Sequence, residues 1–157
     1  MTTLSLTLVS DSAASTHQIG QTFGEKLTGG VCVCLVGPLG AGKTEFVKGA
    51  CTGLGVTDEV ISPTFILYEA FEARLPVVHI DLYRLEHESE LDELGVFDLV
   101  GTETILLAEW GNRSQQLMAD AGITVTITPD AHHNEKRTIV FEFVPAFQEI
   151  LGTANTW

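Results

Sequence analysis

Apolar and polar residues alternate in three segments, one near the start of the chain and two near its end. A period of two is typical of β-strands that bury one face. We therefore predict strands at residues 4–9, 123–128 and 138–143. The last two are joined by a polar loop, residues 129–137, and are expected to form an antiparallel hairpin at the edge of a sheet.

Other apolar segments have no alternation. Residues 31–36 are continuously apolar, which is typical of a strand buried on both faces of a parallel sheet, and residues 104–108 are expected to form another buried strand. Residues 64–71 and 76–82 also have strand composition and are separated by a turn. We predict four further strands from these segments.

Spacings of about four between apolar residues predict helices between the strands. One is expected to begin after Asp11 or Ser12, either of which can cap it, and to end near residue 27. A second is expected at residues 44–54. The acidic segment 86–100 is expected to form two short helices, broken near Gly95. The chain thus has the composition of an α/β protein.

The composition of the whole chain limits the kinds of protein that it can be. A chain of 157 residues with 45% apolar residues predicts one globular domain, residues 1–157, with a tail after about residue 151 that is expected to be disordered. No apolar run approaches the ~18 residues of a membrane span, so we expect a cytoplasmic protein with no membrane contact. The 21 acidic and 8 basic residues give a net charge of −13, which disfavours direct binding to nucleic acid.

The segment after the apolar run 31–36 carries the clearest chemistry, the sequence Gly37-Pro38-Leu39-Gly40-Ala41-Gly42-Lys43-Thr44. It matches the phosphate-binding pattern G-x-x-x-x-G-K-[ST] between a predicted strand and a predicted helix. Its glycines allow backbone N–H groups to turn toward phosphates, Lys43 supplies a positive charge, and the Thr44 hydroxyl can bind Mg²⁺. We predict a nucleoside triphosphate site, and the lack of an N-K-x-D motif disfavours GTP.

A phosphate-binding loop of this kind requires a carboxylate for the metal at the end of a neighbouring strand. Asp81 and Glu109 both follow apolar strands and both are candidates; the alternative for each is an ordinary solvated carboxylate. Thr64 lies in a loop after the helix that follows the phosphate-binding loop, where switch-type NTPases place a threonine that responds to the γ-phosphate through Mg²⁺. A turn closed by Ser62-Pro63 explains Thr64 equally well.

Five sequence blocks follow one another along the chain: 39–44 (Leu-Gly-Ala-Gly-Lys-Thr), 62–65 (Ser-Pro-Thr-Phe), 79–85 (His-Ile-Asp-Leu-Tyr-Arg-Leu), Glu90-Leu91 with Gly95, and Glu109-Trp110. In this order they resemble the TsaE family, formerly called YjeE, over about residues 10–143. The resemblance implies an α/β fold of the P-loop NTPase type, a three-layer sandwich with a mainly parallel central sheet and antiparallel edge strands.

The resemblance also implies a function. It is that of an accessory ATPase, weak alone, which acts with the proteins TsaB and TsaD in threonylcarbamoylation of adenosine 37 in ANN-decoding tRNAs. Contact with tRNA would be indirect, through this complex. The implied cofactors are ATP and Mg²⁺. The residues carried over for nucleotide binding are Gly37, Leu39, Gly40, Ala41, Gly42, Lys43, Thr44, Glu45, Thr16 and Arg137, and those for the metal are Thr44, Glu109 and Asp81.

By the same resemblance, Asp81, Glu109 and Thr64 would serve catalysis, and Trp110 and Tyr83 would respond to partners. Packing of these two aromatic rings on the sheet rim is an equal alternative. The chain departs from the family pattern at Pro38 and at Glu45, and the added negative charge of Glu45 is expected to weaken nucleotide binding modestly unless its side chain points away.

Two other functions remain open at this stage. A small-molecule kinase with a P-loop requires several arginines to clamp phosphates, and this chain has only four: Arg74, Arg84, Arg113 and Arg137. A nucleotide-sensing module without significant turnover requires the same loop and carboxylates, so the sequence does not separate it from a slow ATPase.

Overall fold

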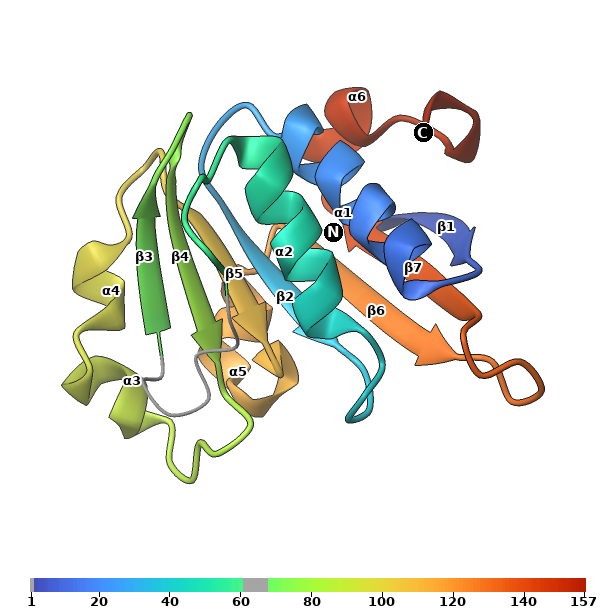
Figure 1. The fold of residues 1–157 in the computed structure, drawn as a ribbon. Coiled ribbons are helices and arrows are strands. Elements are labelled where there is room, and N and C mark those ends of the chain that lie inside the picture. The colour runs from blue at the N-terminus through green and yellow to red at the C-terminus, as the bar shows by residue number, and fades with distance from the viewer. Residues whose placement is uncertain (1, 61–67) are drawn as a thin grey trace.

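The computed structural model describes residues 2–60 and 68–157. A seven-stranded sheet forms its centre, with the spatial order β1-β7-β6-β2-β5-β4-β3 (Figure 1). The strands are β1 Leu4–Ser10, β2 Val31–Val36, β3 Tyr68–Glu72, β4 Pro76–Asp81, β5 Ile105–Glu109, β6 Ile123–Pro129 and β7 Arg137–Phe143.

The middle of the sheet is parallel and its edges are antiparallel. Strands β4, β5, β2 and β6 run in one direction, whereas β3 at one edge and β7 and β1 at the other pair antiparallel. The predicted fold class is confirmed. The predicted hairpin position is wrong, because β6 joins the parallel strands beside β2 and β1 forms the edge beyond β7.

Helices cover both faces of the sheet. Their bounds are α1 Ala13–Lys26, α2 Lys43–Leu54, α3 Ser89–Glu93, α4 Val96–Leu99, α5 Gln115–Asp120 and α6 Gln148–Leu151. Helices α1 and α2 lie side by side on one face (Figure 1). The buried side chains of α3, α4 and α5 belong to a separate apolar cluster on the other face, together with Val78, Ile80 and Leu106. Two cores with the sheet between them make the three-layer sandwich.

Local signals explain where several helices begin. The Ser12 hydroxyl accepts a hydrogen bond from the Ser15 amide at 3.0 Å, so Ser12 is the cap of α1. Gly95 separates α3 from α4 with a left-handed φ of 69°, as the predicted break requires. Helices α5 and α6 were not predicted, because segments of 6 and 4 residues carry too little periodicity.

Helices α1 and α2 pack with their backbones in close contact. A Cβ atom built on Gly49 of α2 would lie 2.0 Å from the His17 carbonyl oxygen, and one on Gly24 of α1 would lie 2.2 Å from the Ala50 carbonyl oxygen. Only glycine fits such approaches. This packing holds α2, and therefore the phosphate-binding loop at its start, against the rest of the fold.

The C-terminal tail, for which disorder was expected, is described to its last residue. The Trp157 ring lies 5.0 Å from the Phe141 ring, and its indole N–H donates to the Leu151 carbonyl oxygen at 2.8 Å. Among the described residues, no helix is long and apolar enough to cross a membrane.

Candidate functional site

The phosphate-binding loop connects β2 to α2 at the carboxyl ends of the parallel strands. Gly40 and Gly42 have φ of 78° and 104°, values that side chains other than glycine rarely adopt. Gly42 caps α2, so the positive end of this helix faces the loop. These glycines give the loop a shape suited to binding an anion through backbone N–H groups.

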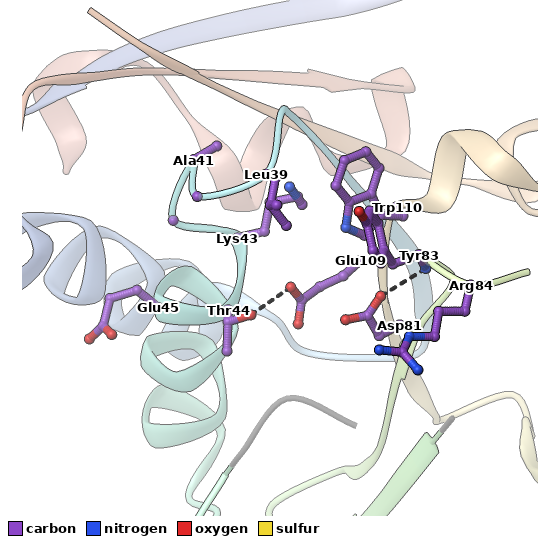
Figure 2. A pocket seen from close by; sticks show the side chains of 12 residues that line it. Leu39, Ala41, Lys43, Thr44, Glu45, Asp81, Tyr83, Arg84, Glu109 and Trp110 are labelled. Atoms are coloured by element: carbon purple, nitrogen blue, oxygen red, sulfur yellow. Dashed lines mark hydrogen bonds between the residues drawn. The ribbon is translucent and has the colours of Figure 1, made fainter. Parts of the chain in front are cut away.

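A cavity of about 380 Å³ opens beside this loop (Figure 2). Its walls come from the loop, from the start of α2 and from the ends of β4 and β5. The lining residues are Leu39, Gly40, Ala41, Gly42, Lys43, Thr44, Glu45, Asp81, Tyr83, Arg84, Glu109 and Trp110. Nearly all of the residues predicted to bind phosphate or metal thus meet in one cavity.

Lys43 lies at the centre of this arrangement and is 4% exposed. Its Nζ donates to the carbonyl oxygens of Gly37 at 2.7 Å and Pro38 at 2.9 Å, and lies 4.1 Å from the centre of the Trp110 ring. Burial lowers the pKa of Lys43, while the charges of Glu109 and Asp81 oppose this shift. The ammonium group is therefore held by the loop itself.

Thr44 and Glu109 are joined directly. The Thr44 hydroxyl donates to Glu109 Oε1 at 2.7 Å (Figure 2). Asp81 is the register neighbour of Glu109 across β4 and β5, and its Oδ1 accepts from the Tyr83 amide at 2.9 Å. Both carboxylates are buried, at 7% exposure for Asp81 and 2% for Glu109.

These oxygen atoms suit Mg²⁺. The described residues contain no group of three or more His, Cys, Asp and Glu side chains that could hold a metal by itself. Mg²⁺ is commonly bound by one or two carboxylates together with substrate phosphates. A hydroxyl, Thr44, and a carboxylate, Glu109, beside a phosphate-binding loop fit that pattern.

Aromatic side chains close one side of the cavity. The rings of Tyr83 and Trp110 lie 5.1 Å apart, and the Arg113 guanidinium lies 5.5 Å and 5.6 Å from them. Trp110 has a φ of 57°, the only positive φ at a non-glycine residue among those described. Such a conformation is unfavourable for a bulky side chain and is typical of functional sites. Arg113 was not predicted as a site residue, because no motif marks it.

A second cavity, of about 230 Å³, lies on the other side of the loop and is lined by Ala13, Thr16, Gly40, Ala41, Gly42, Glu45, Glu135 and Arg137. The hydroxyl groups of Thr16 and Ser10 are hydrogen-bonded at 2.6 Å. Arg137 Nε donates to the Ala41 carbonyl oxygen at 2.9 Å. The Arg137 side chain therefore contacts the backbone of the phosphate-binding loop.

Glu45 points away from the carboxylates of the first cavity (Figure 2). Its Oε1 lies 3.1 Å from His17 Nδ1, a contact between α2 and α1. Glu45 nevertheless lines both cavities, so its expected weakening of nucleotide binding stays a prediction. Thr64, the third residue predicted for catalysis, lies outside the described residues.

One residue of the site was missed in a block that the sequence analysis had singled out. His79 precedes Asp81 by two positions in β4, so both side chains share one face of the strand. Its Nε2 lies 2.6 Å from Glu109 Oε2. The sequence held a signal for His79, because side chains two positions apart in a strand lie on the same face and Asp81 was already a candidate site residue.

A glycine-rich loop between a parallel strand and a helix, in a sheet with antiparallel edges, defines a fold of the P-loop NTPase class. The TsaE family, described as threonylcarbamoyl adenosine biosynthesis protein TsaE, matches residues 10–139, and the chain belongs to this family. Membership assigns it to tRNA threonylcarbamoyladenosine biosynthesis.

Individual relatives agree with this assignment. The tRNA threonylcarbamoyladenosine biosynthesis protein TsaE of Treponema pallidum (strain Nichols) is 36% identical over 131 residues, which cover 83% of this chain and 97% of the relative. The TsaE protein of Bacillus subtilis (strain 168) is 37% identical over 123 residues, 78% of this chain and 75% of the relative. The crystal structure of B. subtilis YdiB matches with a TM-score of 0.73 at 26% identity and covers 96% of this chain and 93% of that one.

Proposed function

We propose that this protein binds ATP with Mg²⁺ and hydrolyses it slowly, as an accessory ATPase that acts with TsaB and TsaD in threonylcarbamoylation of adenosine 37 of tRNA. The observation that carries the proposal is the hydrogen bond between Thr44 and Glu109. Both residues line the cavity beside the phosphate-binding loop, together with Lys43. The family assignment supplies the pathway.

Phosphate binding is supported by the loop. Its glycines give it a shape suited to binding an anion through backbone N–H groups, and the Lys43 ammonium, which donates to the carbonyl oxygens of Gly37 and Pro38, would donate to phosphate oxygens instead. Because the Lys43 ammonium lies 4.1 Å from the centre of the Trp110 ring, such an exchange would alter its contact with this ring.

Thr44 and Glu109 would hold Mg²⁺, with Asp81 beside them. When bound, the ion neutralises charge on the phosphates. The Thr44 hydroxyl would offer its oxygen to the ion while it keeps donating its hydrogen to Glu109. Asp81, held through the Tyr83 amide, is the residue best placed to orient water.

Partner binding is supported by the rim of the cavity and by charge. Leu39 and Tyr83 are 74% and 38% exposed at the mouth of the site, where a partner protein would bury their apolar surface. The net charge of −13 disfavours direct binding of tRNA. Other proteins would therefore contact the tRNA.

The kinase alternative loses support because two of the four arginines are bound to the backbone. Arg74 donates to the carbonyl oxygens of Leu27 and Gly24, and Arg137 donates to that of Ala41. Only Arg84 and Arg113 remain near the cavity. Two arginines are few for clamping both a donor and an acceptor phosphate.

The proposal is tested by ATP hydrolysis with the purified protein, alone and with TsaB and TsaD. Lys43→Ala is the blank, because removal of the ammonium is expected to abolish ATP binding. We expect weak turnover alone and stimulation by the partners. ATP binding without turnover under either condition would favour the nucleotide-sensing module, and wild-type affinity in Lys43→Ala would contradict the site.

A further inference from the structure

A buried imidazole lies directly behind the carboxylates of the site. The His79 side chain is 0% exposed, and its Nε2 lies 2.6 Å from Glu109 Oε2. His79 does not line the cavity, and its Nδ1 has no hydrogen-bond partner among the described residues. Its one polar contact in that part of the chain is therefore with Glu109.

The sheet register explains this contact. In the parallel pairing of β4 with β5, His79 is opposite Leu107, and Asp81 is opposite Glu109. His79 thus lies one step farther from the strand ends than the two carboxylates and reaches diagonally across to Glu109. Asp81 and His79 share a strand face, so the same alternation places one at the cavity and the other behind it.

Glu109 is consequently held at both oxygens. Oε2 contacts His79, and Oε1 accepts from the Thr44 hydroxyl. As a carboxylate, Glu109 can only accept, so Nε2 carries the proton in this hydrogen bond. A carboxylate with both oxygens bonded is fixed in orientation, whereas without His79 only the hydrogen bond from Thr44 would restrain its terminal torsion.

We propose that His79 is a positioning residue, which fixes the Glu109 carboxylate with Oε1 toward Thr44 and so preorganises the metal side of the site. This inference rests on the proposed function, since it presumes that Glu109 and Thr44 hold Mg²⁺. Partners behind a metal ligand orient it, and their loss typically weakens metal affinity about 10- to 100-fold.

The test measures the affinity of the protein for a fluorescent ATP analogue, once with Mg²⁺ and once without it. The ratio of these two affinities, the Mg²⁺ ratio, is the readout. Three variants are compared: His79→Leu, which has no donor; His79→Asn, whose amide nitrogen replaces Nδ1 and does not reach Glu109; and His79→Gln, whose amide nitrogen replaces Nε2. We expect the Mg²⁺-dependent gain in affinity to fall about 10- to 100-fold in the first two and to be restored in His79→Gln. Affinity without Mg²⁺ is expected to stay unchanged.

Thermal unfolding without ligand separates this role from a merely structural one. If His79 only supports the core, the variants lower the unfolding temperature while the Mg²⁺ ratio stays at the wild-type value, and the inference is overturned. Should His79→Leu fail to fold, the comparison of His79→Asn with His79→Gln decides. An equal loss in both would also overturn the inference.

The proposed function has its own control in the same assay. Lys43→Ala must lose binding of the analogue with and without Mg²⁺. A wild-type protein that does not bind the analogue, or binds it without any response to Mg²⁺, contradicts the proposed function. A wild-type protein that responds to Mg²⁺, with all three His79 variants equal to it, contradicts the inference alone.

Discussion

The Arg137 side chain is bonded to the backbone of the glycine-rich loop. Its guanidinium donates to the Ala41 carbonyl oxygen at 2.9 Å and reaches that of Gly40 at 3.5 Å, so it supports the shape of this loop. This contact joins the start of β7 to the loop. The contact indicates a role in shaping the loop, and the contact with ATP that the family resemblance implies stays a prediction, since Arg137 also lines the second cavity.

We predict that Arg137→Ala weakens ADP and ATP binding by the same factor, about tenfold, since loss of a charged hydrogen bond costs about 1.5–3 kcal/mol and part of the loop shape remains. Arg137→Lys is not expected to restore binding, because an ammonium group lacks the planar fork. Calorimetric titration with both nucleotides measures this. A loss confined to ATP would show that Arg137 contacts the γ-phosphate instead.

Glu109 is the carboxylate on which the proposed binding of Mg²⁺ depends most directly. We predict that Glu109→Gln folds, because the amide keeps the volume of the side chain and its bonding to Thr44, and that Mg²⁺-dependent turnover is lost. Asp81→Asn is the matched comparison. Turnover that survives in Glu109→Gln and disappears in Asp81→Asn would assign the metal to Asp81. Circular dichroism of both variants checks the fold.

At the scale of elements, the contact of α1 with α2 fixes the position of the loop. Alanine in the interior of a helix normally stabilises it by about 0.5–1 kcal/mol relative to glycine. At Gly49 the added Cβ would lie 2.0 Å from a carbonyl oxygen of α1, so the effect is expected to be reversed.

We therefore predict that Gly49→Ala lowers the unfolding temperature by about 2–10 °C, from an overpacking cost of about 1–3 kcal/mol. Gly29→Ala is the control, because nothing lies within 4 Å of its added Cβ. Differential scanning fluorimetry compares the two. A Gly49→Ala protein at least as stable as wild type would show that the helices separate at little cost.

The strand and the helix on either side of the glycine-rich loop were predicted from the sequence almost to the residue. The apolar run that became β2 has the predicted bounds Val31–Val36, and α2 begins one residue earlier than expected, at Lys43. The position of the β6–β7 hairpin was not predictable, because alternation defines a strand and not its neighbours. That β1 pairs with β7 from the opposite end of the chain is a nonlocal contact with no local signal.

The candidate site also contains residues that were predicted from the sequence and residues that were missed. The loop and the two carboxylates were predicted because each has a defined place relative to a strand. His79 was missed, since its contact with Glu109 crosses from β4 to β5 and depends on register. Arg113 was missed, since it contacts the Trp110 ring within one short turn and no motif marks such a pair. The directions of Glu45 and Arg137 likewise appear only in the folded chain.

At the scale of the whole molecule, charge restricts what the protein contacts. With 21 acidic and 8 basic residues, the surface repels phosphate backbones. We predict no saturable binding of tRNA by the protein alone at physiological salt, measured by fluorescence anisotropy with labelled tRNA. Binding that weakens with added salt would contradict this prediction, because such dependence is the signature of phosphate contacts.

The most direct test of the proposed function is the formation of threonylcarbamoyladenosine in tRNA by a reconstituted mixture that contains TsaB, TsaD and a source of the threonylcarbamoyl group. The product is quantified by mass spectrometry of the digested tRNA. We predict sustained modification with the wild-type protein and none beyond the mixture's own background with Glu109→Gln or Lys43→Ala. Full modification in the presence of either variant would contradict a role for ATP turnover at this site.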